Sequence, residues 1–256
     1  MLDAHLHLCD ETLYPEADLL IAEALENNVT QFLCVVTNHE ELQRGLLLKA
    51  KYPMLKLAAS TTPHEAITEE DPFFKQVEHH AIRGDLDAIG ETGLEYFHPG
   101  LNKGLQRAYL NRYVQLAIRC KLPLIFHCRE GFRDLFDYLK PFRGQFKGMI
   151  HCFTGSYDEA EEGIALGLFI SLSGIVTFKN ARGLQTAVEA LPIEALLIET
   201  DCPYLAPLSK RGQVNRPKFI QETYEKVASL KNMPVHALEE QVKSNYTQFF
   251  CCHKNI

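Results

Sequence analysis

Short apolar runs alternate with stretches of helical spacing along the whole chain. Between residues 101 and 120, for example, Leu105, Tyr109, Tyr113 and Leu116 fall near one face of a helix. Each apolar run is short enough to be one buried strand. We therefore predict about eight strands with helices between them, in the runs MLDAHLHL from residue 1, QFLCVVT from 31, LKLAAST from 55, DAIGETGL from 87, PLIFHC from 123, GMIHCF from 148, LFISLSG from 168 and ALLIET from 195.

This alternation predicts an α/β fold, a (β/α)8 TIM-type barrel. Continuously apolar strands are typical of parallel sheets, which are buried on both faces and need helical crossovers. An open, doubly wound sheet is the main alternative, but it would concentrate polar residues at one switch point, whereas here they follow strands from first to last. The 256 residues suit a single barrel domain over positions 1–256.

Composition and charge narrow the class of protein. A net charge of −7 gives no general attraction for nucleic acid, so a polyanionic substrate would have to be held by local arginines or bound metal. We see no apolar run of membrane-spanning length and no signal-peptide pattern in MLDAHLHLCD. We expect a soluble, cytoplasmic protein with no membrane contact and no obligate protein partner, and a monomer is the favoured state.

The eight cysteines indicate buried free thiols rather than a disulfide framework. Cys34, Cys120 and Cys128 lie in apolar runs, and the vicinal Cys251 and Cys252 lie at the tail. Because structural zinc needs clustered thiolate ligands and the chain has no CxxC pair, we do not expect a zinc–thiolate site.

Two histidines lie in the first predicted strand. Strand alternation sends His5 and His7 to the same face, while Ala4 and Leu6 point the other way. Two imidazoles inside a dry barrel need partners, and a divalent metal satisfies both. Core histidines bonded to backbone or to Asp3 are the alternative.

Four further polar residues follow later strands. Glu91 lies in the tail of the fourth strand between Gly90 and Gly93, which keep its surroundings open. Each alone has an ordinary structural explanation, such as a salt bridge, a core histidine or a turn aspartate. Together they belong to the rim where barrel active sites lie, and they are Glu91, His127, His151 and Asp201.

These six side chains would meet at one mouth, because closing a barrel makes its first and eighth strands neighbours. Four histidines and two carboxylates suit zinc, and the carboxylates also permit magnesium or manganese. The sequence thus predicts a metal site whose ligands are His5, His7, Glu91, His127, His151 and Asp201.

At these positions the chain resembles the TatD family of metal-dependent hydrolases, within the amidohydrolase-like barrels. The resemblance runs from the first strand to NYTQFF near the C-terminus. It is carried by DAHLHL, GETGLEYF, the Gln106 region before PLIFHCRE, HCFTGS, SLSGIVTFKNA, and IETDCPYLAP followed by RGQVNRP.

The resemblance implies two divalent metal ions per chain. His5 and His7 would hold one ion with Asp201, His127 and His151 would hold the other, and Glu91 would bridge them. Family members are described as deoxyribonucleases, so the implied activity is hydrolysis of phosphodiester bonds in DNA, with DNA or a nucleotide-type molecule as substrate.

Two positions depart from the family pattern. Thr62 in STTPHEA stands where the family usually has the first histidine of Gly-x-His-Pro-His, so only Pro63 and His64 match. Glu95 stands where the family usually has an aspartate in Gly-Leu-Asp-Tyr, and we expect it in a loop, hydrogen-bonded to backbone or substrate. These departures leave the ligand set intact and bear on substrate contacts and rate.

Paired metals lower the pKa of a water between them and stabilise the attacking and leaving oxygens on phosphorus. Asp201 is the candidate to orient that water and accept its proton, and Glu91 has a structural role in the metal pair. Candidate donors to the phosphate oxygens are His64, Arg129, Arg211 and Asn215. A solvated surface position for the arginines, and a helix cap for Asn215, are the alternatives.

Two other functions stay open from the sequence. The same activated water attacks carbonyl carbon, so a metal-dependent amidase or esterase acting on a nucleotide-linked or aminoacyl substrate is the first. A metal-binding scaffold without catalysis is the second, and Thr62 is its main support.

Overall fold

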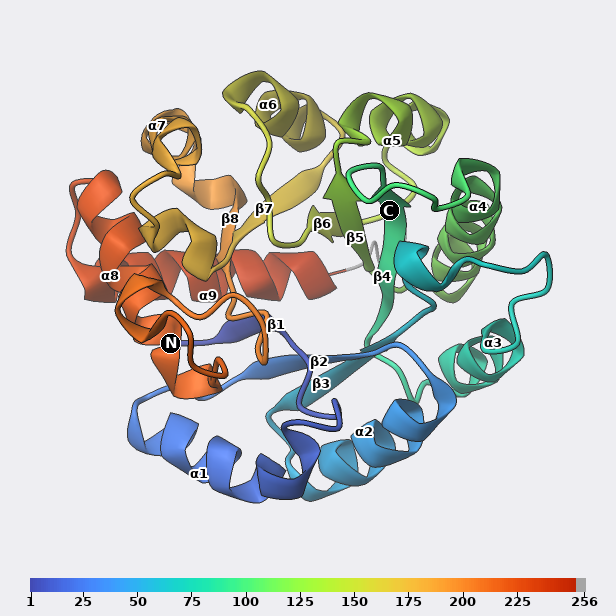
Figure 1. The fold of residues 1–256 in the computed structure, drawn as a ribbon, viewed down its shortest axis with the longest axis horizontal. Coiled ribbons are helices and arrows are strands. Elements are labelled where there is room, and N and C mark those ends of the chain that lie inside the picture. The colour runs from blue at the N-terminus through green and yellow to red at the C-terminus, as the bar shows by residue number, and fades with distance from the viewer. Residues whose placement is uncertain (252–256) are drawn as a thin grey trace.

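Eight parallel strands form one sheet in the order β1 to β8 in the computed structural model, which describes residues 1–251. Each predicted apolar run coincides with one strand, although β4 and β5 extend one residue beyond their runs, and Figure 1 looks down the barrel that the strands enclose. This confirms the predicted (β/α)8 barrel. The strands are β1 Asp3–Leu6, β2 Phe32–Val36, β3 Leu55–Ala59, β4 Ala88–Glu95, β5 Leu124–Arg129, β6 Gly148–Ile150, β7 Leu168–Leu172 and β8 Leu196–Ile198.

The segment that follows β8 closes the barrel against β1. The Asp201 N–H donates to the carbonyl oxygen of His5 at 2.9 Å, and the His7 N–H donates to that of Cys202 at 2.8 Å. The buried Asp3 carboxylate accepts hydrogen bonds from the Thr200 N–H at 2.9 Å and hydroxyl at 2.6 Å. Closure therefore places the first and last ligand-bearing segments side by side, as the sequence predicts.

Helices α1 to α8 surround the strands as a ring in Figure 1. Helix α9 instead covers the N-terminal end of the barrel, where the Asn245 amide donates to the carbonyl oxygens of Ile193 and Leu196, at the start of β8. The site described below lies at the opposite end. The α-helices are α1 Ala17–Glu26, α2 His39–Lys51, α3 Phe74–Arg83, α4 Lys103–Cys120, α5 Phe132–Leu139, α6 Tyr157–Ala165, α7 Arg182–Ala190, α8 Ile220–Leu230 and α9 Val235–Phe250.

Short 3-10 helices shape the connections, and five of those in the described residues lie in loops at the C-terminal ends of strands, namely Tyr14–Glu16, Pro63–Glu65, Gly174–Thr177, Leu208–Lys210 and Pro217–Phe219. The other two are Lys140–Phe142 and Ile193–Ala195. In the long loop after β8, Pro207 precedes one short helical turn and Pro217 begins another, and this loop carries the chain from the last strand to α8.

Strand burial explains the continuous apolar runs. All five residues of β2 and all five of β7 are buried, because the barrel core lies on one face and the helices on the other. Among residues 1–251, we find no helix with the length and apolar character needed to cross a bilayer. The cysteines described by the structure are free, most of them buried, and Cys252 lies outside the described residues.

Candidate metal centre

A first cluster at the C-terminal rim joins β1 to the segment after β8. His5 and His7 point the same way, and their Nε2 atoms lie 3.1 Å apart. Asp201 Oδ1 lies 3.7 Å from Nε2 of His5 and 3.4 Å from Nε2 of His7. All three residues are buried, and their ligand atoms are close enough together to hold one metal ion.

A second cluster joins β4, β5 and the residue after β6. His127 Nδ1 lies 3.1 Å from His151 Nε2 and 3.5 Å from Glu91 Oε2. The same Glu91 oxygen contacts His151 Nε2. These three ligand atoms also converge closely enough to hold one ion.

The two clusters touch each other. The rings of His5 and His151 stack with 4.0 Å between centroids and an interplanar angle of 9°. Glu91 turns its other oxygen, Oε1, toward His7 Nε2 at 3.9 Å. The structure therefore brings all six sequence-predicted residues together, with the Glu91 carboxylate between the two clusters, beside a cavity of about 330 Å³.

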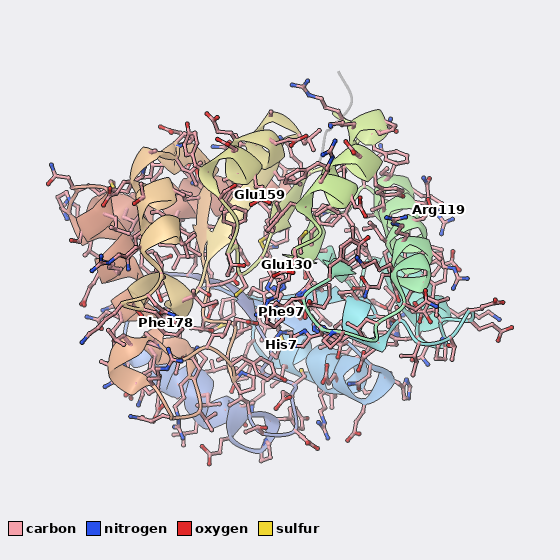
Figure 2. The ribbon with its side chains drawn as sticks, turned by 45° about the horizontal axis from the view of Figure 1, so that its top comes forward. His7, Phe97, Arg119, Glu130, Glu159 and Phe178 are labelled. Carbon is pink, nitrogen blue, oxygen red and sulfur yellow. The ribbon has the colours of Figure 1, made fainter. Side chains whose placement is uncertain are left out.

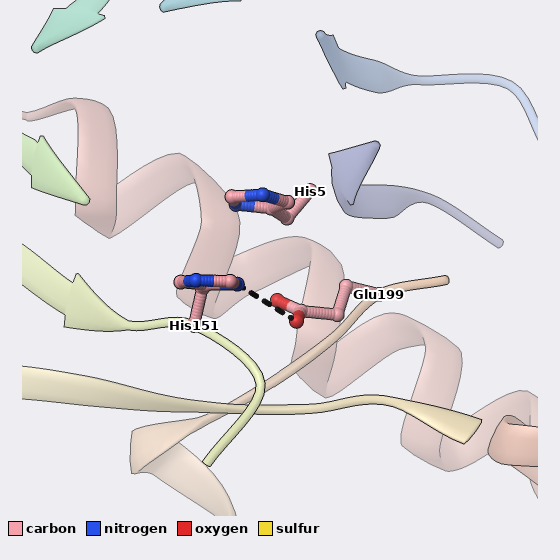
Figure 3. A group of neighbouring side chains, drawn as sticks. All are labelled: His5, His151 and Glu199. Atoms are coloured by element: carbon pink, nitrogen blue, oxygen red, sulfur yellow. Dashed lines mark ion pairs between the residues drawn. The ribbon is translucent and has the colours of Figure 1, made fainter. Parts of the chain in front are cut away.

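Two buried glutamates hold the second cluster from behind. Glu95 Oε2 lies 3.1 Å from His127 Nε2, and Glu199 Oε1 lies 3.5 Å from His151 Nδ1. Figure 3 shows the Glu199 carboxylate at the edge of the His151 ring, below the stacked ring of His5. A carboxylate on one ring nitrogen fixes the tautomer and leaves the other nitrogen for a metal.

Sequence reasoning missed Glu199. It directly follows the last residue of β8 and is fully buried, and it accepts hydrogen bonds from the Cys152 N–H at 2.7 Å and from the Ser171 hydroxyl. The signal was present, because a carboxylate ending the apolar run ALLIE meets the same strand-end rule that selects Asp201.

The positions of three carboxylates differ in detail from the sequence prediction. Glu91 lies near the middle of β4, since that strand continues to Glu95, so Glu95 ends a strand and does not lie in a loop. Its expected backbone hydrogen bonds are present, from the N–H groups of Phe97 at 2.7 Å and His98 at 3.1 Å. Asp201 lies beyond the end of β8, in the left-handed conformation with φ 57°.

The two glycines beside Glu91, Gly90 and Gly93, allow β4 to pack closely on β5. The sequence suggested only that they keep the surroundings of Glu91 open. Gly93 has φ 152°, and a β-carbon there would lie 1.9 Å from the carbonyl oxygen of His127. A β-carbon on Gly90 would lie 2.5 Å from Cβ of Ile125. Only glycine lets β4 approach β5 this closely, which brings Glu91 to His127.

Mutual charge shifts the pKa values within the clusters. Burial lowers the pKa of His7, but the hydrogen bond with Asp201 and the charge of Glu91 outweigh it and raise that pKa to about 9. Burial raises the pKa of Glu91, and the charge of His151 with the hydrogen bond from His127 more than reverses it, leaving that pKa well below its usual range. The clusters thus favour an ionised Glu91 and a protonated His7, whereas burial and the charge of His151 lower the pKa of His5. A cation can replace the protons in this charge balance.

The donor set also fits divalent metal through the way its atoms converge. Glu91 Oε2 faces a ring nitrogen of His127 and one of His151, and the outer nitrogens of these rings face Glu95 and Glu199. Buried imidazole and carboxylate groups facing one another are costly unless protons or an ion satisfy them. Imidazole and carboxylate together are the ligands that zinc prefers, and the carboxylates also suit manganese and magnesium.

The sequence-predicted substrate residues lie at different distances from the cavity. His64 and Thr62 line it, and His64 Nε2 lies 3.4 Å from Glu95 Oε2. Arg129 and Arg211 are exposed and lie outside that lining, with their guanidinium groups over the rings of Phe97 at 3.7 Å and Phe178 at 4.5 Å. In the view of Figure 2, Phe178 lies to the left of Phe97 and His7.

Asn215 is fully buried and braces the loop after β8. Its amide donates to the carbonyl oxygens of Thr200 at 2.9 Å and Tyr204 at 2.7 Å, and its side-chain oxygen accepts from the Arg216 N–H. These bonds hold the backbone on both sides of Asp201. We therefore propose that Asn215 positions Asp201, since its amide is buried and already bonded to the backbone.

Comparison with known proteins decides the family. The family model described as TatD related DNase matches residues 2–251. The chain belongs to this family. A relative from Bacillus subtilis, the uncharacterized metal-dependent hydrolase YabD, is 32% identical, with 98% of each chain covered. The uncharacterized metal-dependent hydrolase YcfH of Escherichia coli K12 is 30% identical over 98% of this chain and 95% of its own.

Solved structures agree with this assignment. The crystal structure of the TatD homologue YJJV from Escherichia coli K12 matches with a TM-score of 0.93 and 26% identity, covering 98% of this chain and 97% of that one. A TatD-family hydrolase from Entamoeba histolytica shares the fold with a TM-score of 0.88 at 20% identity, covering 99% and 98% of the two chains. The resemblance inferred from the motifs is confirmed, and the chain is a metal-dependent hydrolase of the TatD family.

Proposed function

We propose that the protein is a deoxyribonuclease that hydrolyses phosphodiester bonds with two divalent ions bound at the rim of the barrel. The observation that carries this proposal is the position of Glu91, whose two oxygens face different ligand clusters, Oε1 toward His7 and Oε2 toward His127 and His151. One carboxylate shared by two clusters is the arrangement expected of a bridging ligand in a two-metal hydrolase.

The ligands divide the work between binding and proton transfer. A bound pair of divalent ions supplies positive charge for the phosphate oxygens and lowers the pKa of the attacking water. Asp201 orients that water and accepts its proton, because its carboxylate lies at the edge of the first cluster and lines the cavity. Glu95 and Glu199 hold His127 and His151 in place and keep their ring nitrogens oriented.

His64 is the proposed donor to the substrate. It is partly exposed, lines the cavity, and is held by the buried Glu95 carboxylate. A histidine so placed contacts a phosphate oxygen through a ring N–H without occupying a metal position. Arg129 and Arg211, outside the cavity, are left for the more distant phosphates of a longer strand.

The test is cleavage of end-labelled single-stranded DNA by metal-stripped protein supplied with magnesium, manganese or zinc. We expect cleavage only with added ion. Glu91→Gln and Asp201→Asn should each lower the rate by at least about 100-fold, the scale expected when one group that stabilises the transition state is lost. Glu189→Gln, an exposed change on α7, is the control and should cleave like the unchanged protein. Intact, metal-loaded protein that cleaves no DNA would contradict the proposal.

A carbonyl-directed hydrolase is the second candidate, and the charge of the cavity favours it. The lining contains Asp10, Glu41 and Glu65 besides the ligand carboxylates. None of the described residues that line it is a lysine or an arginine. Such a cavity suits an amide or ester with little negative charge. A panel of aminoacyl and nucleotide-linked esters, tested beside DNA with the same variants, separates the two.

A further inference from the structure

A second cavity of about 510 Å³ adjoins the metal centre on the β2 and β3 side of the barrel. The loops after those two strands and the start of α3 line it. Thr37, His64 and Glu65 line both this cavity and the one above the metal ligands. A molecule at the ligand clusters can therefore extend into this side pocket past His64.

The side pocket has apolar walls with a few polar groups. Ile67 and Phe73 line it together with Pro72, and Ile67 is 74% exposed, so its apolar surface is accessible to a ligand. The side-chain oxygen of Asn38 accepts a hydrogen bond from the Glu41 N–H. The side-chain oxygen of Gln76 pairs with His39 Nδ1. Their amide N–H groups remain as donors for a ligand.

Charge limits what the pocket can hold. Its lining includes Glu65 and Asp71 but, in the part of the chain that the structure describes, no lysine or arginine. A second phosphate would be repelled there, so a phosphodiester at the metal centre must place an uncharged group in the pocket. A flat ring with apolar faces and hydrogen-bonding edges fits apolar walls with amide donors, within the size range of small-ligand sites.

We propose that the side pocket binds the nucleobase of a nucleotide next to the scissile phosphate. This inference rests on the proposed phosphodiesterase function and deepens it, because it makes a base, and not only a phosphate, part of what the protein recognises. The base packs against Ile67 and Phe73, its edge accepts from Gln76 or Asn38, and His64 lies between base and phosphate.

The test compares thymidylyl-(3′,5′)-thymidine with analogues in which a tetrahydrofuran spacer replaces the 5′ nucleoside, the 3′ nucleoside, or both. We expect removal of one of the two bases to lower kcat/KM. Ile67→Ala should reduce that preference by about tenfold or more, the scale expected when a methylene contact is lost from an apolar pocket. Ile82→Ala, an isoleucine 66% exposed that lines neither cavity, should leave the preference unchanged.

The outcomes separate this inference from the proposed function. Equal cleavage of all four diesters, or a preference that Ile67→Ala does not alter, would overturn the base pocket while the phosphodiesterase stands. Failure to cleave any of the four would count against the phosphodiesterase itself.

Binding gives a readout that does not depend on cleavage. Thymidine added to the metal-loaded protein should shift the methyl resonances of Ile67 and leave those of Ile82 in place. Gln76→Ala should weaken the titration. Thymidine that shifts neither isoleucine at millimolar concentration would overturn the base pocket.

Discussion

The backbone of Gly93 lies against the backbone of His127, so close that a β-carbon at position 93 would meet the His127 carbonyl oxygen at 1.9 Å. This approach brings the Glu91 strand to the His127 strand, and the second ligand cluster depends on it. Gly93 is therefore needed both for the packing of β4 on β5 and for the second ligand cluster.

Gly93→Ala should displace β4 from β5. We expect a loss of about 3 kcal/mol or more in the free energy of unfolding, since an alanine at φ 152° is strained and its β-carbon overlaps a backbone oxygen. Urea unfolding measures this. Gly100→Ala is the matched control: its φ is also positive, at 87°, but nothing lies within 4 Å, so strain alone should cost about 1 kcal/mol. Equal losses in the two variants would contradict the packing argument.

Glu199→Gln tests whether the buried carboxylate prepares His151 for metal. The substitution keeps the shape but removes the charge that faces His151 Nδ1. We expect zinc affinity to fall about 10- to 100-fold, as when a residue that orients a metal-binding histidine is replaced. A competitive chelator titration measures it, with Glu189→Gln as the exposed control. Unchanged zinc affinity in a folded Glu199→Gln protein would contradict the proposal that Glu199 orients His151 for metal binding.

Protons should compete with metal at His7. With its pKa raised to about 9, the His7 imidazole is protonated near pH 7 in the metal-free protein and must lose that proton to bind an ion. We expect zinc binding at about pH 7 to release at least one proton per chain. Calorimetric titrations in two buffers of different ionisation enthalpy count the released protons. Zinc uptake without proton release would contradict the raised pKa of His7.

The same shift makes the metal-free protein less stable in alkali. A pKa raised above its value in the unfolded chain contributes stability that is fully present below about pH 6.5 and is lost as the pH rises through about 9. Unfolding in the presence of chelator should therefore show a falling free energy over this range. Asp201→Asn removes the main cause of the raised pKa and should flatten the fall; an unaltered pH profile in that variant would count against the assignment.

Thr200→Val should weaken the closure of the barrel. The variant removes the hydroxyl that donates to the buried Asp3 carboxylate. An unpaired buried acceptor costs about 1 to 3 kcal/mol. Thermal or urea unfolding measures the loss, and Thr186→Val on the exposed side of α7 is the control. If both variants were equally stable, the Asp3 and Thr200 contact would not contribute to closure.

The strands and the six converging residues could be predicted from the sequence because both follow from local periodicity. Alternation in β1 is enough to place His5 and His7 on one face, and barrel closure is enough to bring Asp201 to them. These inferences need only the order of the strands and the rule that their C-terminal ends share one rim.

Features that depend on contacts between distant loops could not be predicted. The side pocket forms where Asn38 after β2 meets Ile67 and Phe73 after β3, and nothing in either segment alone indicates the other. The role of Glu95 depends on Gln106 of α4, whose buried amide bonds both the N–H and the carbonyl of Glu95. The bracing contacts of Asn215 could not be predicted for the same reason, since its partners lie 11 and 15 residues away in the chain.

The number of divalent ions bound per chain tests the central claim most directly. Zinc or manganese content, measured by elemental analysis after equilibrium dialysis, should be two ions per chain in the unchanged protein. A His5→Ala and His7→Ala double variant should retain one ion, because the cluster of Glu91, His127 and His151 stays complete. One ion or none in the folded, unchanged protein would contradict a two-metal hydrolase built on these six residues.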